Sequence, residues 1–323
     1  MLEKCLLSNN GDKNIESHMS IANTTSIRGV AILAVILHHF SQYYDVSIYV
    51  HDILDHFGYL AVGVFLFLSG YGNAVSFKKK TMGIKDTIIW GMKRILSIVV
   101  SFVIIYLISF WAIKLFVPAI EYSFRIKDMI TLTLPTWTNW YLKVQIGLYM
   151  LFTVLALLFQ KDEIRLILLF ILVAFYILFA RYMGLANFWW NSILCYPMGI
   201  LAEKFKNITC KLKYKKIYAV LFLAFFVVFT YLKQWNNIFG VCSCACFVLV
   251  MYLINSCRPL CCRSLSFIGK YTLEIYMVHL IVMRILLYCP VNKYMSLFLI
   301  IVISIPISIG INRLSYLVLK EMK

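Results

Sequence analysis

Charged side chains are scarce in this chain. They make up 14% of its 323 residues, whereas 62% are hydrophobic and the mean hydropathy is +0.84. No soluble domain has this balance. The polar connections are also short, so the sequence leaves no room for a catalytic domain outside the apolar segments. Any chemistry must therefore take place inside a membrane-embedded helix bundle or at its faces.

The first eighteen residues lack the apolar core of a signal peptide. We expect residues 1–20 to form a polar, disordered tail, with Met19 as an alternative start to Met1. Residues 21–320 are expected to form a single transmembrane domain. The sequence also shows no internal repeat, which argues against the transporters that are built from paired halves.

The ten cysteines do not indicate a disulfide framework. Several lie inside predicted helices, and others fall in a loop that we place in the reducing cytoplasm. Cys242, Cys244 and Cys246 are conceivable metal ligands, but residues two apart point to different faces of a helix. We therefore expect no metal ligands here and assign most of these thiols to apolar packing.

Ten stretches are long and apolar enough to cross a hydrocarbon core about 30 Å thick. They cover 26–44, 58–76, 95–117, 137–159, 164–182, 188–203, 216–233, 237–255, 268–288 and 294–318. Most of the 31 Lys and Arg residues fall on the side that holds both termini. The positive-inside rule then places both termini in the cytoplasm, in agreement with an even number of spans. The sequence predicts an all-α, polytopic membrane bundle, and its net charge of +17 needs no nucleic-acid partner.

Arg28 and His39 stand in the first of these apolar stretches. Eleven residues of helix bring them to nearly the same face, about 16 Å apart. Arg28 then lies at a membrane surface and His39 near the bilayer centre, where a polar side chain is costly unless it lines a cavity or has a partner. A functional site is the favoured interpretation. The alternatives are that Arg28 reaches the lipid headgroups as an anchor and that His39 only joins two helices by a hydrogen bond.

Four segments together resemble the membrane acyltransferases of acyltransferase family 3. Arg28 to His39 is similar to the family's Arg/Lys-x10-His signature, and Gly63 to Tyr71 to its second-helix GVxxFFxxSGF block. Trp140 to Leu142 resembles a mid-chain aromatic segment, and Ile268 to His279 the late GxxSLxIYLxH block. The family usually has Arg-x-x-Arg and then Pro after the second helix. Here Arg94 matches, while Gly91 and Ser97 replace the first Arg and the Pro.

The resemblance implies transfer of an acyl group, commonly acetyl, from a cytoplasmic acyl-CoA to a hydroxyl of an envelope polysaccharide or lipid-linked sugar. It implies the bacterial cytoplasmic membrane as the location, and acyl-CoA as a donor substrate with no bound cofactor. A neutral imidazole suits proton abstraction from an alcohol near neutral pH, so His39 is the candidate base or acyl carrier. Arg28 would bind or orient the donor. Lys93 and Arg94 are candidate phosphate contacts.

Several further residues are assigned supporting roles. Ser69 is a candidate hydrogen-bonding residue of the cavity, although Gly63 and Gly70 beside it favour helix packing. His279 and, one turn before it, Tyr276 are expected to support the site. Trp140 belongs to an aromatic belt or stacks on sugar. Lys143, one turn deeper, needs a partner or a cavity.

Two other classes of protein remain open from the sequence. In a transporter or flippase of lipid-linked saccharide, the buried Arg28 and His39 would serve a substrate or proton path. A membrane scaffold without chemistry would leave both residues unexplained.

Overall fold

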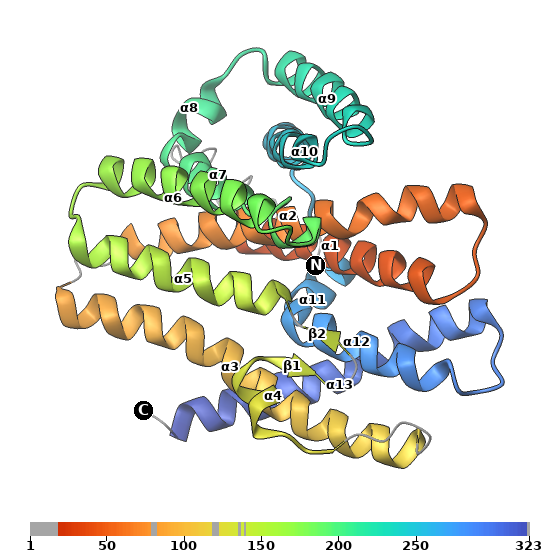
Figure 1. The fold of residues 1–323 in the computed structure, drawn as a ribbon. Coiled ribbons are helices and arrows are strands. Elements are labelled where there is room, and N and C mark those ends of the chain that lie inside the picture. The colour runs from red at the N-terminus through yellow and green to blue at the C-terminus, as the bar shows by residue number, and fades with distance from the viewer. Residues whose placement is uncertain (1–18, 79–82, 118–122, 135–136, 139, 322–323) are drawn as a thin grey trace.

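The structure is a computed structural model that describes residues 19–78, 83–117, 123–134, 137–138 and 140–321. The expected tail over residues 1–20 lies almost wholly outside this part. The described chain is nearly all helical, as predicted (Figure 1). Its elements in chain order are α1 (Ile21–Tyr43), α2 (Ile48–Lys78), α3 (Ile84–Phe116), α4 (Ile126–Ile130), β1 (Thr133–Leu134), β2 (Trp137–Thr138), α5 (Trp140–Leu158), α6 (Asp162–Tyr182), a 3-10 helix (Asn187–Trp189), α7 (Cys195–Lys204), α8 (Lys206–Lys211), α9 (Lys215–Leu232), α10 (Ile238–Cys257), α11 (Arg263–Gly269), α12 (Thr272–Leu286) and α13 (Lys293–Glu321).

The two short strands pair antiparallel, with Thr133 opposite Thr138. In Figure 1, α9 and α10 lie together along one side of the molecule, while α3 and α13 lie along the opposite side. Between them α2 packs against α1 and α7, and α3 packs against α5 and α13. Eight of the described helices are long and apolar enough to cross a membrane. The bent pair α11 and α12 makes a ninth if it is counted as one span.

We call one end of the bundle the basic end and the other the aromatic end, after side chains that lie there. At the basic end, Lys78, Asp162 and Lys204 line one small cavity. At the aromatic end, the Trp140 ring lies 5.4 Å from Phe188 and 6.3 Å from Trp189. The chain between Trp189 and Lys204 therefore runs from one end of the bundle to the other.

The predicted span 188–203 is wrong as a continuous helix. Only α7, ten residues long, is α-helical within it. Pro197 stands in the first turn of α7 and has no N–H to bond the carbonyl four residues earlier, so the helix does not extend towards Trp190. Turns fill the preceding residues, and there the Ser192 hydroxyl donates to the Tyr59 carbonyl of α2 at 2.6 Å.

The predicted span 268–288 is also interrupted. Helices α11 and α12 meet at an angle of 79° around Lys270 and Tyr271. Helix α11 is held against α1 instead of continuing the line of α12. The Thr25 hydroxyl lies 2.7 Å from that of Ser266, and the Ser26 hydroxyl donates to the Cys262 carbonyl at 3.2 Å. The break therefore follows from tight packing of α11 on the first helix.

Glycines make this close approach possible. A Cβ added at Gly269 would overlap the Thr25 carbonyl, and one at Gly29 would overlap the Leu265 carbonyl. The same holds between α2 and α7, where a Cβ at Gly70 would overlap the Tyr196 carbonyl. This agrees with the expectation that the glycines of the second helix serve helix packing.

Changing Gly269 to alanine is expected to destabilise the protein by about 1–3 kcal/mol, because the backbones of α1 and α11 must move apart. The thermal midpoint in detergent, followed by size-exclusion chromatography, would fall. Gly147 is the matched control, since a Cβ there meets nothing within 4 Å. The alanine variant at Gly147 should be as stable as the parent or more so. Equal midpoints for the two variants would contradict the packing argument.

Candidate functional site

A cavity of about 150 Å³ lies among α1, α2, α3, α5 and α12. Its wall includes three of the residues that the sequence singled out, Arg28, Ser69 and Tyr276. The other lining residues are Phe65, Ile98, Tyr141, Gln145, Tyr149, Thr272 and Leu273. Residues from the first, second and last thirds of the chain thus meet around one space.

Helix α5 supplies a polar face to this cavity. Tyr141, Gln145 and Tyr149 are spaced four residues apart, so they share one side of the helix. The Tyr141 hydroxyl donates to Gln145 Oε1 at 3.3 Å, and Gln145 Nε2 donates to Ser69 Oγ at 2.8 Å. Ser69 Oγ also lies 2.9 Å from the Tyr149 hydroxyl. Sequence reasoning missed Gln145 and Tyr149, although polar residues at this spacing in an apolar span are a recognisable signal.

These contacts define what Ser69 does. Its hydroxyl is bonded to an amide and to a phenol, neither of which is a base at neutral pH. The Ser69 hydroxyl is therefore bonded into the wall of the cavity, and within the described residues its hydrogen bonds involve no base of the kind that a nucleophile needs.

The break before α12 turns the start of that helix towards the cavity. Thr272 and Leu273, its first two residues, line the space. The first N–H groups of a helix have no partner within the helix and carry partial positive charge. Together with the Arg28 guanidinium, they give the cavity a positive character that suits a phosphate or a developing oxyanion.

A buried carboxyl group fixes α12 in this position. Glu274 is 3% exposed and accepts hydrogen bonds from Ser101 Oγ of α3 at 3.2 Å and from Asn312 Nδ2 of α13 at 3.0 Å. Helix α12 is thereby tied to two neighbours. This holds Tyr276 at the cavity and places His279 one turn further along the helix.

His39 and His279 form a buried pair. His39 Nδ1 lies 2.9 Å from His279 Nε2, and the two side chains come from residues 240 positions apart. His39 is 7% exposed and His279 is fully buried. A second contact runs from His279 Nδ1 to the Ile275 carbonyl at 2.9 Å. His279 is therefore in hydrogen-bond contact with the candidate base.

The hydrogen bonds assign the protons of this pair when both rings are neutral. A carbonyl oxygen only accepts, so His279 Nδ1 carries the proton donated to Ile275. His279 Nε2 then accepts a proton from His39 Nδ1, and His39 Nε2 carries a lone pair. This is the tautomer that a general base requires, and a second group fixes its orientation.

His38, the neighbour of His39, is held differently. Its Nδ1 donates to the Leu54 carbonyl at 3.1 Å, and its Nε2 lies 3.1 Å from Gln42 Nε2. Both ring nitrogens are therefore occupied by structural contacts. This supports the choice of His39 over His38.

The structure separates His39 from the cavity that holds Arg28. His39 does not line that cavity, so the two residues do not share this space. Ile32, Val35 and Ile36 of α1 are buried between the two residues and pack in the core. Tyr276 connects the two places, since it lines the cavity and its ring lies 6.1 Å from that of His279.

Arg94 adjoins the cavity, whereas Lys93 does not. The Arg94 guanidinium donates to Ser76 Oγ at 2.6 Å and lies 4.7 Å from the Trp90 ring. It also lies 5.7 Å from the ring of Tyr149, a cavity residue. Lys93 is exposed, because one residue along a helix turns the side chain by about 100°. The structure thus brings only one of the two predicted phosphate contacts to the site.

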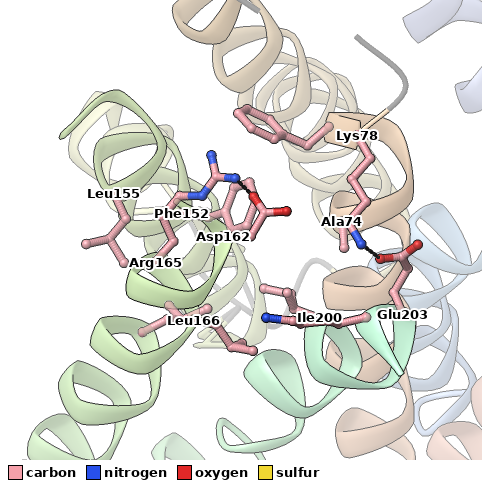
Figure 2. Close-up of a pocket in the computed structure, with 12 residues that line it drawn as sticks. Ala74, Lys78, Phe152, Leu155, Asp162, Arg165, Leu166, Ile200 and Glu203 are labelled. Atoms are coloured by element: carbon pink, nitrogen blue, oxygen red, sulfur yellow. Dashed lines mark hydrogen bonds and ion pairs between the residues drawn. The ribbon is translucent and has the colours of Figure 1, made fainter. Parts of the chain in front are cut away.

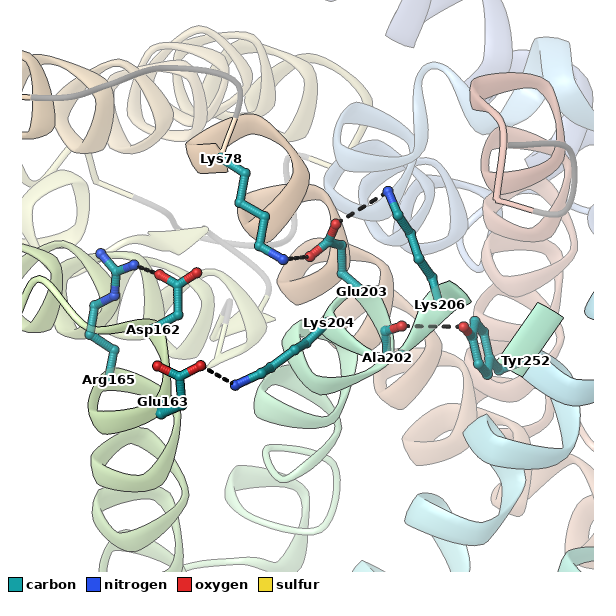
Figure 3. A network of polar contacts seen from close by, with 9 residues as sticks. All are labelled: Lys78, Asp162, Glu163, Arg165, Ala202, Glu203, Lys204, Lys206 and Tyr252. Atoms are coloured by element: carbon teal, nitrogen blue, oxygen red, sulfur yellow. Dashed lines mark hydrogen bonds and ion pairs between the residues drawn. The ribbon is translucent and has the colours of Figure 1, made fainter. Parts of the chain in front are cut away.

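Four other cations at the basic end, Lys78, Arg165, Lys204 and Lys206, are paired with carboxylates. Lys78 Nζ lies 2.5 Å from Glu203 Oε2, and Arg165 pairs with Asp162 (Figure 2). Lys204 Nζ lies 2.7 Å from Glu163 Oε1, and Lys206 Nζ lies 3.4 Å from Glu203 Oε1 (Figure 3). Within the described part of the chain, Arg28 and Arg94 form no such carboxylate pair. These two guanidiniums are consequently better suited to an incoming anion.

Two predicted supporting residues lie away from the cavity. Trp140 belongs to the ring cluster at the aromatic end, as a belt residue would. Lys143 is half-buried and forms no hydrogen bond or ion pair with the residues that the structure describes. Neither side chain lines the space around Arg28.

Comparison with known proteins identifies the family. Searches of curated proteins and of solved structures gave no match. A family model described as an acyltransferase domain matches residues 23–313, nearly the whole chain. The match includes the cavity, the histidine pair and at least the greater part of every membrane helix described above. The chain is therefore a multi-pass membrane protein that belongs to acyltransferase family 3, and it is an acyltransferase.

Proposed function

We propose that this protein is an O-acyltransferase of the bacterial cytoplasmic membrane. It moves an acyl group, in the simplest case acetyl, from cytoplasmic acyl-CoA to a hydroxyl of an envelope polysaccharide or lipid-linked sugar. The observation that carries the proposal is the buried His39–His279 pair, whose hydrogen bonds leave His39 Nε2 as the proton-accepting atom. No bound cofactor is needed for this chemistry.

The donor is proposed to approach from the basic end, which the positive-inside rule assigns to the cytoplasm. Arg94 would contact its phosphates. The Arg28 guanidinium and the first N–H groups of α12 would stabilise negative charge on the thioester oxygen. The acyl end of the donor would pass Tyr276 to reach the histidine pair, so movement of the Tyr276 side chain is part of the proposal.

The reaction moves the acyl group from the sulfur atom of CoA to the oxygen atom of the acceptor hydroxyl. His39 Nε2 accepts the proton of the acceptor hydroxyl as its oxygen attacks the acyl carbon. The carbon–sulfur bond then breaks, and the CoA thiolate leaves and takes up a proton. The proton balance is neutral, because the alcohol loses one proton and CoA gains one.

The test uses the full-length protein in lipid vesicles with acetyl-CoA labelled in the acetyl group. We expect CoA to be released over time only when acceptor from the cell envelope is added, and the label to appear in the acceptor. A transporter or flippase of lipid-linked saccharide would instead move saccharide across the vesicle membrane without acetyl-CoA. That outcome, with no CoA release, would reject the proposal.

Arg94 offers a test of donor binding. Its change to alanine is expected to raise the KM for acetyl-CoA about tenfold or more, since a hydrogen bond to a charged group contributes about 1.5–3 kcal/mol. The measurement is the initial rate of CoA release against acetyl-CoA concentration. Lys93→Ala is the matched control and should leave this KM within about twofold of the parent, because Lys93 is exposed. The opposite ranking would remove Arg94 from the site.

A further inference from the structure

A second open space lies at the other end of the bundle, between α2 and the connection from α9 to α10. It has a volume of about 620 Å³, within the range of about 300–1,000 Å³ that is typical of ligand sites. We call it the outer groove. Its lining residues are His56, Phe226, Val227, Thr230, Tyr231, Lys233, Gln234 and Asn237. None of these residues belongs to the cavity around Arg28.

The outer groove is amphiphilic. Phe226 and Val227 form its apolar part on α9, a helix of which only 6% of the most apolar stretch is buried within the protein. Gln234 and Asn237, on the following connection, are exposed. Their side chains form no hydrogen bond with the described residues and present amide donors and acceptors to the groove. An occupant with an apolar chain and a polar head fits this surface.

Two further groups favour a head rich in hydroxyls. His56 Nδ1 is buried and has no hydrogen-bond partner within the described chain. Tyr231 and Trp235 are 62% and 64% exposed, and their rings lie edge to face at 4.8 Å beside the groove. Exposed aromatic rings next to amide groups match the alternating C–H faces and hydroxyls of a sugar ring.

The local charges argue against an anionic head. Asp52 and Asp55 lie at the start of α2, and residues 44–57 contain no Lys or Arg. Lys233, the ammonium group among the lining residues, lies 4.1 Å from the Tyr59 ring. Burial lowers the pKa of the Lys233 ammonium, an effect that Asp55 partly offsets. An uncharged saccharide is therefore better suited to this surface than a phospholipid headgroup.

The outer groove is also close to the histidine pair. Asp55, whose charge acts on the Lys233 ammonium, lies 3.9 Å from His38 Nδ1. The His38 ring in turn lies 5.1 Å from that of His39. Asp55 and His38 are thus the side chains that link the groove to the proposed base.

We infer that the outer groove binds the uncharged saccharide head of a glycolipid acceptor, with its lipid chain along Phe226 and Val227. This rests on the proposed function and narrows it from an envelope carbohydrate in general to a lipid-linked one. Gln234 and Asn237 hydrogen-bond the sugar hydroxyls, and Tyr231 packs on the ring. The groove sets the affinity for the acceptor and takes no part in the chemical step.

The test measures initial rates of acetyl transfer by the full-length protein against the concentration of glycolipid extracted from the source membranes. Gln234→Ala and Tyr231→Ala are expected to raise the acceptor KM about three- to tenfold each. The kcat and the KM for acetyl-CoA should not change. Gln160→Ala, at an exposed residue near the basic end, and Tyr294→Ala, 76% exposed on α13, are the matched controls.

The outcomes separate the two proposals. If the parent protein releases no CoA with any envelope acceptor, the proposed function fails and the groove assignment falls with it. If the parent is active and both groove variants keep the acceptor KM of the controls, the groove assignment alone is overturned. It is overturned as well if native mass spectrometry finds a phospholipid that Gln234→Ala loses while the acceptor KM stays unchanged.

Discussion

Replacing His39 with alanine is expected to lower the rate of acyl transfer about 10²- to 10⁴-fold, the usual contribution of a general base. The alanine variant has no group to accept the proton of the attacking hydroxyl. Its KM for acetyl-CoA should change little, because His39 does not line the cavity around Arg28. Acceptor-dependent CoA release in vesicles measures both quantities.

The neighbouring histidines are the controls for this result. His38→Ala should keep activity within a few-fold of the parent, since both His38 nitrogens make structural contacts. His279→Ala should lower kcat, because His39 loses the acceptor that fixes its tautomer. His279→Gln, which returns an acceptor atom, should recover part of the loss. Full activity in His39→Ala together with loss in His38→Ala would show that the base is misassigned.

Replacing Arg28 with alanine is expected to reduce kcat/KM for acetyl-CoA about 10- to 150-fold, which corresponds to the loss of about 1.5–3 kcal/mol from a charged hydrogen bond. Arg28 is the cation in the wall of the cavity and has no carboxylate partner among the described residues. Its guanidinium is therefore available to the donor. Initial rates over a range of acetyl-CoA concentrations measure the effect.

Two variants make the Arg28 result specific. Arg28→Lys keeps the charge and should recover part of the activity, although a lysine does not offer the planar, two-pronged donor geometry. Arg258→Ala removes an exposed arginine that follows α10 and should behave like the parent. If Arg28→Ala bound and used acetyl-CoA as the parent does, Arg28 would be only a membrane anchor.

Much of the fold follows from hydrophobic length alone. Eight predicted spans each correspond to one long helix in the structure, since an apolar run that must cross a bilayer has no better way to satisfy its backbone. One of them, 137–159, becomes helical only at Trp140, after strand β2. The other two spans are interrupted: Pro197 limits the helix within 188–203, and the break within 268–288 depends on a contact between distant residues. Helix α12 begins at Thr272 and not at residue 268, because Gly269 packs on the backbone of Thr25. Hydropathy does not reveal this contact.

The site was predictable only in part, because some of its contacts join residues that are far apart in the chain. The position of Arg28 and His39 on one helix is local information, and the sequence contains it. The 2.9 Å contact between His39 and His279 joins two helices far apart in the chain, so spacing indicates only that both are buried. Gln145 and Tyr149 were within reach of helix periodicity but were not identified. The outer groove depends on how α9 and α10 meet α2, which no local pattern specifies.

The structure also bears on the transport alternative. Transporters with broken helices usually carry them in corresponding positions of two repeated halves. Among the described residues, one bent pair is present, α11 with α12. The break turns the start of α12 towards the cavity with Arg28. Acyl transfer gives this break a role without a second broken helix in a repeated half.

The most direct test of the account compares the envelope carbohydrate of three strains by mass spectrometry: cells that lack this gene, and the same cells with the parent gene or with His39→Ala restored. The account predicts that an ester mass is lost on deletion, returns with the parent and does not return with His39→Ala. Identical carbohydrate in all three strains, or full recovery with His39→Ala, would contradict it.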